Sequence, residues 1–153
     1  MAWIRAYDFT TTPDQTPSWT AYDYPKGVAD AKSLCADTVG ARVTMGRDGK
    51  LYFAGYRAGG NSILSKQSND LNTNADNPSP DSFQKTTDTK SNNITCFARL
   101  NPSSGLVEKG SFLLSRNDTS LAGNSQPNGN TIQPLAINAD ESGRVYVGGF
   151  SAY

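Results

Sequence analysis

Hydrophobic and small residues occupy both faces of one segment, residues 41–58, and the same pattern returns at residues 135–152. The two copies align without a gap at an interval of 145 − 51 = 94 residues. Internal similarity of this kind indicates a repeated structural unit. The matched positions are Gly49 and Gly143, Leu51 and Val145, Tyr52 and Tyr146, Phe53 and Val147, Gly55 and Gly149, and Tyr56 and Phe150.

Each copy is typical of a β-hairpin. Asp48-Gly49 and Ser142-Gly143 are turn signals, since glycine adopts the positive φ that a short hairpin needs. After the turn the side chains alternate between faces, and both faces are apolar or small. A sheet with one wet face would alternate apolar with polar residues. We therefore expect each hairpin to be covered by other layers on both sides.

The remaining segments divide into ordered and irregular parts. Residues 3–9 alternate as one strand, residues 10–25 read as an irregular loop, and residues 28–35 have the spacing of a short helical turn. Residues 94–100 and 106–114 are two strands, joined by the strong turn signal Asn-Pro-Ser-Ser-Gly.

Two polar stretches separate these elements. Residues 59–93 and 115–130 are rich in asparagine, serine and threonine and carry few large apolar side chains. Such segments bury little surface to offset the entropy of ordering. We expect both to be long polar loops, and residues 59–93 to lie on the surface without paired strands.

Composition narrows the function classes. Fourteen basic and fourteen acidic residues leave no net charge, which gives no indication of nucleic-acid binding. Apolar runs are too short for a membrane span. The chain has no histidine, the commonest general base and transition-metal ligand near neutral pH. We expect no enzyme activity, no metal and no cofactor.

The order of these parts resembles the bacterial seven-bladed β-propeller repeat (SBBP) family. Residues 140–150, DESGRVYVGGF, match its first hairpin, and residues 96–105, CFARLNPSSG, match its next strand and turn. The resemblance implies an all-β fold of antiparallel propeller-like blades. Residues 42–114 would form one four-stranded blade with a long loop at 59–93. Residues 3–9 would be the outer strand of a preceding blade, and residues 131–153 the inner hairpin of the next.

One full blade and two part-blades cannot close a ring, because propellers need at least about four blades. Two explanations stay open: the chain is a fragment of a longer propeller, or several copies assemble and fill each other's open edges. The expected partners are therefore other blades or copies of the same chain.

Several residues are candidates for sites. Trp19, Tyr22 and Tyr24 lie in the expected loop. They either pack on the rest of the chain or bind a glycan or protein ligand, for which they are the best candidates. Cys35 and Cys96 could form one disulfide, with two free thiols as the alternative. Asn93 and Asn117 begin glycosylation sequons.

The leading hypothesis is a non-enzymatic structural or interaction module of an extracellular or cell-surface protein, whose secretion signal is not present in this chain. One alternative is part of a propeller lyase or glycosidase with its catalytic residues outside these 153 residues. Another is a lectin-like glycan-binding module.

Overall fold

The chain is an all-β protein of several antiparallel sheets, seen in a computed structural model that describes residues 2–10, 16–32, 34, 38–57, 63–75, 94–113, 115–116, 129–130 and 132–151. The elements are β1 (Ile4–Ala6), β2 (Trp19–Ala21), α1 (Lys26–Asp30), β3 (Thr38–Met45), β4 (Leu51–Arg57), the 3₁₀ helix η1 (Ile63–Ser65), β5 (Lys66–Gln67), β6 (Asp70–Asn74), β7 (Ile94–Leu100), β8 (Val107–Leu113), β9 (Ser115–Arg116), β10 (Gly129–Asn130), β11 (Ile132–Ala139) and β12 (Val145–Ser151).

A four-stranded sheet in the order β3-β4-β7-β8 forms the middle layer. Each strand pairs antiparallel with its neighbour in this order. The four-stranded unit expected at residues 42–56, 94–100 and 107–114 is therefore confirmed as a sheet. Gly49 has a φ of 73°, as the turn signal predicted. Gly105 ends the turn between β7 and β8 with a φ of 70°.

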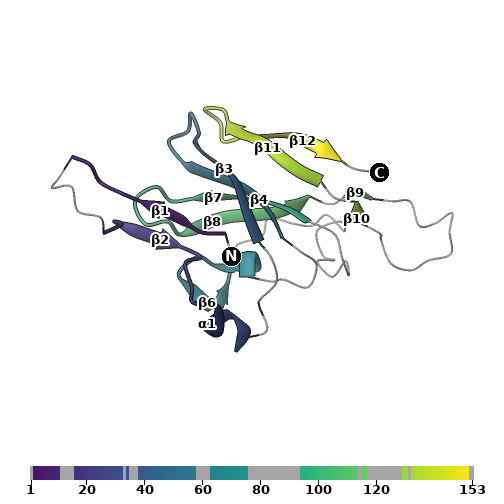
Figure 1. Cartoon of the computed structure of the whole chain (residues 1–153). Helices are drawn as coiled ribbons and strands as arrows, with labels where there is room; N and C mark the ends of the chain where they lie inside the picture. Colours follow the sequence, from purple (N-terminus) through teal and green to yellow (C-terminus); the bar gives the residue numbers. More distant parts are fainter. Residues whose placement is uncertain are drawn as a thin grey trace, which may run out of the picture.

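The two repeat copies form the same hairpin. β3-β4 and β11-β12 have equivalent registers, and each has a bulge at the same place, between Gly40 and Arg42 and between Pro134 and Ala136. Gly143 in the second turn has a φ of 76°. The hairpin of β11 and β12 lies above the middle sheet in Figure 1 and packs against β3 and β4. The repeat in sequence is therefore a repeat in structure.

The opposite face of the middle sheet is covered by β1-β2 and by α1, η1 and β5-β6, below the sheet in Figure 1. One apolar cluster joins these layers, because residues of β1 and β2 share it with residues of β4, β7 and β8. Its members include Ile4, Ala21, Tyr22, Leu34, Phe53, Ile63, Leu71, Cys96, Leu100 and Phe112.

Two expected loops contain core strands. Residues 10–25 include β2, which pairs with β1 and buries Ala21 completely. Residues 59–93 include η1, β5 and β6, which bury Ile63 and Leu71. A few apolar side chains suffice to order a short polar segment when it can lie on an existing sheet. The expectation for residues 76–93 lies outside the described residues.

Other expected boundaries shift by a few residues. The strand expected at residues 3–9 is limited to β1, and the helical turn expected at 28–35 begins earlier, as α1. The hairpin of β3 and β4 is covered by β11 on one side but only in part on the other, because Val43 and Met45 of β3 are exposed there. The hairpin of β11 and β12 is open on its outer face, which carries exposed apolar side chains within this chain.

Candidate functional site

The interface between the two hairpins shows how these sheets stack. Tyr52 and Ala54 of β4 lie against Ile137 and Ala139 of β11, and all four are buried. The Tyr52 hydroxyl donates a hydrogen bond to Asp48 Oδ2 at 2.7 Å. Burial, and then this bond to a carboxylate, raise the pKa of Tyr52 to about 12. One apolar face of the first hairpin is thus matched to one apolar face of the second.

Polar contacts fix the register of this stack. The backbone N–H of Arg47 donates to the carbonyl oxygen of Ala139 at 3.1 Å. Arg47 Nη1 also lies 3.1 Å from Glu141 Oε1 in an ion pair whose side chains are 73% and 70% exposed. These two residues occupy equivalent repeat positions with opposite charges.

The outer face of the β11-β12 hairpin is the first open surface. Leu135, Tyr146 and Phe150 are exposed there by 52%, 59% and 49%. Tyr146 is the repeat equivalent of Tyr52, which is 1% exposed. Because the same position is covered in the first copy and open in the second, this face has the shape of a sheet interface without its partner.

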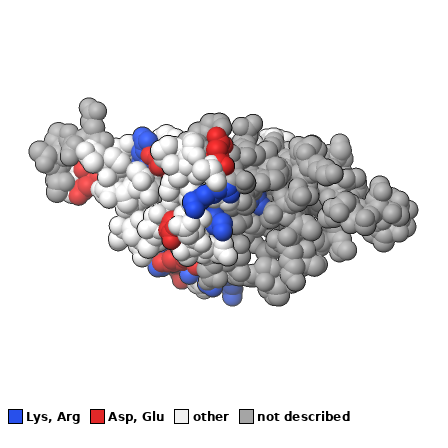
Figure 2. Space-filling model, turned by 90° about the horizontal axis from the view of Figure 1, so that it is seen from below, with Lys and Arg blue, Asp and Glu red and all other residues white. Residues whose placement is uncertain are grey.

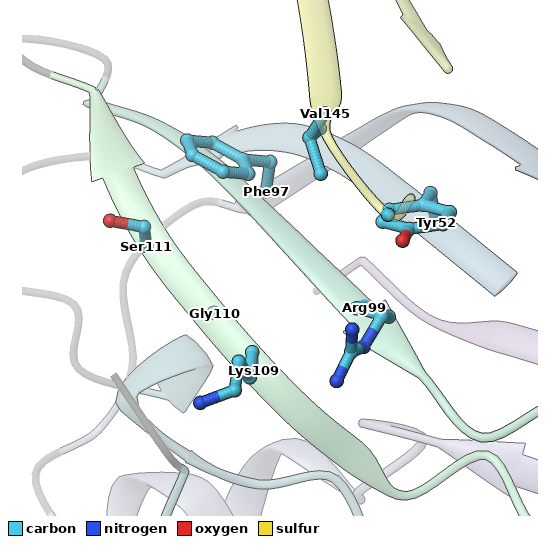
Figure 3. A pocket seen from close by; sticks show the side chains of 8 residues that line it. Tyr52, Phe97, Arg99, Lys109, Gly110, Ser111 and Val145 are labelled. Carbon is cyan, nitrogen blue, oxygen red and sulfur yellow. The ribbon is translucent and has the colours of Figure 1, made fainter. Parts of the chain in front are cut away.

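A cavity of about 130 Å³ lies beside β12, over the β7-β8 half of the middle sheet (Figure 3). Glu108 on β8 holds the nearby cations, since its two carboxylate oxygens lie 2.6 Å from Lys50 Nζ and 3.0 Å from Arg99 Nε. The cavity is lined by Tyr52, Phe97, Arg99, Lys109, Gly110, Ser111, Gly143 and Val145.

The second open surface is on the other side of the molecule. Trp3 and Tyr7 flank β1, exposed by 53% and 40%, and the Arg5 guanidinium lies 4.4 Å above the Trp3 ring. Val43 and Met45 of β3 are exposed by 49% and 56%. The register pairs them with Phe53 and Leu51, so they lie on the face that β1 and β2 cover only in part.

The charges of the described surface are mixed. Figure 2, seen from below the view of Figure 1, shows Lys and Arg close to Asp and Glu. Arg5 pairs with Asp23 at 2.6 Å in this part of the chain. Neighbouring charges of opposite sign cancel at a distance, so the described part of this face lacks the one-sign field that attracts a polyanion.

The structure places the predicted binding aromatics inside the fold. Tyr22 is 3% exposed and its hydroxyl donates to the Lys66 carbonyl oxygen at 3.0 Å. Trp19 packs on Gly105 and its Nε1–H donates to the Pro102 carbonyl oxygen at 2.9 Å. Tyr24 is half-buried against the same cluster. The three side chains hold the covering layer on the middle sheet and do not form an open binding platform. Among the described residues, the exposed aromatics are Trp3, Tyr7, Phe9, Tyr146 and Phe150.

The open face of β12 could have been predicted from its sequence, because its outward positions are as apolar as its inward ones.

Nothing in the sequence around Arg57 indicates that its side chain is buried. Its side chain is fully buried and lies 4.1 Å above the Phe112 ring, and burial lowers the pKa of Arg57 to about 10. Arg57 and Phe112 come together because β4 pairs with β7 and β7 pairs with β8. These pairings join residues that are more than fifty positions apart in sequence.

Cys96 is a buried free thiol in the core. Cys35, Asn93 and Asn117 lie outside the described residues, so the glycosylation sites stay predictions. For the cysteines, the structure has the second alternative at Cys96, a free thiol. Burial raises the pKa of the Cys96 thiol to about 12.

The Cys96 thiol is expected to resist alkylation in the folded chain. In a Cys35→Ser variant at about pH 8, its reaction with a thiol reagent should be at least ~100-fold slower than in the chain unfolded in guanidinium. Because the folded pKa is raised above the unfolded value of 9.0, the stabilisation from the neutral thiol is complete below about pH 9 and is lost as the pH rises toward about 12. Equal rates in the folded and unfolded chain would show that the thiol is not buried.

Carboxylates of the hairpin turns have local structural roles. Asp48 accepts from the Lys50 backbone N–H at 3.1 Å, and Asp140 accepts from the Ser142 backbone N–H at 2.9 Å. Within the described residues, no group of three or more Cys, Asp or Glu side chains could hold a metal ion. No described helix has the length and hydropathy to cross a membrane.

The site defined by these observations is a pair of open sheet faces on an all-β protein. Comparison with protein-family models, curated proteins and solved structures found no match to this chain.

Proposed function

We propose that the chain is a non-enzymatic structural and interaction module of the β-propeller type, which associates through its open sheet faces. The observation that carries the proposal is the outer face of β11 and β12. It exposes Tyr146 at the position where the first hairpin buries Tyr52 under a covering layer, and Phe150 lies exposed on the same face. The stacked antiparallel sheets and the resemblance to a propeller repeat support the class of the module.

Energetics favour association through this face. Fully burying a large apolar side chain contributes about 1.5–3 kcal/mol relative to leaving it exposed. Leu135, Tyr146 and Phe150 are all exposed on the β11-β12 strand pair, and an open apolar sheet surface promotes association unless it is covered. An extracellular or cell-surface location is part of the proposal and is supported by the family resemblance alone.

Replacing Tyr146 and Phe150 together with lysine is expected to weaken self-association of the chain at least ~10-fold, a loss of about 1.4 kcal/mol or more. Sedimentation velocity over a concentration series measures the change. Val28→Lys is the matched control, because Val28 is exposed on α1, away from both open faces. A wild-type chain that stays monomeric at every concentration, with a cooperative melt, would overturn the proposal.

A further inference from the structure

We propose that the partner is a second copy of this chain, bound head to tail, so that β11-β12 of one copy and β1-β2 of the next form one four-stranded sheet. The inference rests on the proposed function and specifies its partner. It starts from the β1-β2 and β11-β12 layers that cover the middle sheet. In the described part of the chain each of these layers has two strands, whereas the middle sheet has four.

The two covering layers lie over different halves of the middle sheet. β11 packs on the β3-β4 half of one face. On the other face, β2 lies over the β7-β8 half, because Trp19 bonds to Pro102 in the β7-β8 turn and Ala21 and Tyr22 join the cluster with Phe112. The β11-β12 layer thus corresponds to the β3-β4 half of a four-stranded sheet, and the β1-β2 layer corresponds to the β7-β8 half.

The edges of these layers match the order of the middle sheet. In that sheet β4 pairs with β3 on one side and with β7 on the other. Among the described strands, β12 pairs only with β11, and β1 pairs only with β2. Placing β1 of a second copy beside β12 repeats the β4-β7 pairing and gives the order β11-β12-β1-β2.

The faces brought together by this pairing are the open ones. The outer face of the β11-β12 hairpin, with Tyr146 and Phe150, would lie on the next copy's exposed Val43 and Met45. This repeats the packing of hairpin on hairpin seen inside the chain, where Ile137 and Ala139, the repeat equivalents of Val43 and Met45, are buried against Tyr52.

The aromatic side of β1 in the second copy would fill the cavity beside β12 in the first copy. Trp3 and Tyr7 are on the exposed side of β1, and Ile4 on its other side is buried in its own chain. The cavity presents the Phe97 ring and the Arg99 guanidinium (Figure 3). Aromatic rings stack on rings and on guanidinium groups, so these surfaces are chemically complementary.

Such a contact joins two different surfaces, so it is heterologous. Repeating it produces a closed ring if the rotation closes, and an open filament if it does not. Each copy contributes one complete sheet and one shared sheet, so a ring of about four to eight sheets needs about two to four copies.

The experiment mixes two variants that each block one surface. The head variant carries Tyr146→Lys and Phe150→Lys, and the tail variant carries Val43→Lys and Met45→Lys. All four side chains are exposed, so circular dichroism and melting curves should match the wild type. Sedimentation velocity is expected to show a monomer for each variant alone and a dimer, with nothing larger, for the equimolar mixture.

The alternative outcomes separate the two proposals. If the tail variant still self-associates and the head variant does not, two outer faces of β11-β12 pair with each other. That result overturns the head-to-tail contact and leaves the proposed function standing. A monomeric wild type would assign the open faces to further repeats of a longer chain and overturn both.

Tryptophan fluorescence tests the position of β1. Association of the wild type is expected to shift the emission to shorter wavelength, and the Trp3→Phe variant should associate without most of this shift. Trp19 is already packed on Gly105 and serves as the internal control. A shift that is the same in both proteins would show that β1 stays in solvent, which overturns the shared sheet.

Discussion

Replacing Tyr52 with alanine is expected to lower the free energy of unfolding by about 3–5 kcal/mol, the range for removal of a large buried aromatic ring. Tyr52 is 1% exposed and lies between the middle sheet and the β11-β12 hairpin. Its loss removes apolar contact from both layers and leaves the Asp48 carboxylate without its hydroxyl donor. Denaturant unfolding at a low protein concentration measures the effect.

Two variants divide the effect of Tyr52 into its parts. Tyr52→Phe removes only the hydrogen bond to Asp48 and should cost about 1 kcal/mol. Tyr146→Ala changes the repeat-equivalent residue, which is 59% exposed, and should cost no more than about 0.5 kcal/mol in the monomer. Equal losses for Tyr52→Ala and Tyr146→Ala would contradict the stacking order of the two hairpins.

The second large effect is expected at the repeated glycine of each hairpin. Gly55→Ala should destabilise the fold by about 3 kcal/mol, because the added Cβ would lie well inside van der Waals contact of the Val39 carbonyl oxygen. A backbone oxygen held in a strand pair cannot move aside as a flexible side chain can. Gly149→Ala meets the Gln133 carbonyl oxygen, at the equivalent position, in the same way.

Gly148→Ala is the matched control for both glycine variants. Gly148 is adjacent to Gly149 on β12, but an added Cβ there has no heavy atom within 4 Å. Thermal melts should show nearly unchanged stability for Gly148→Ala and a marked decrease for Gly149→Ala. Equal melting temperatures for Gly148→Ala and Gly149→Ala would show that the two strands do not approach each other closely at the bulge.

The hairpins could be predicted because their signals are local. The alternation around Tyr52 and Tyr146 and the glycines of the two turns lie within a few residues of each other in sequence. The four-stranded sheet also followed from order along the chain, since its strands pair in sequence order. β2, β5 and β6 were missed because each is only two to five residues long and is ordered by the sheet beneath it.

The candidate site was predicted only in part. The two-faced pattern of the hairpins predicted cover on both sides, and the part-blades predicted open sheet edges. The open outer face of β11 and β12 depends on which copy the chain itself covers. Trp19 and Tyr22 were assigned to an irregular loop, and the sequence did not decide between packing on the rest of the chain and binding a ligand. Their burial depends on contacts with Pro102 and Lys66, which are 83 and 44 residues away along the chain.

The opposite charges at equivalent positions of the two hairpins have a consequence for ionic strength. In a head-to-tail series, Glu141 of each copy would lie between Arg47 of its own chain and Arg47 of the next, so charge would alternate along the axis. Each exposed pair contributes only about 0–1 kcal/mol and is screened over about 8 Å at physiological salt. The alternation would therefore have little influence on how tightly the copies bind, but it would disfavour stacking of two identical hairpins, which places like charges together.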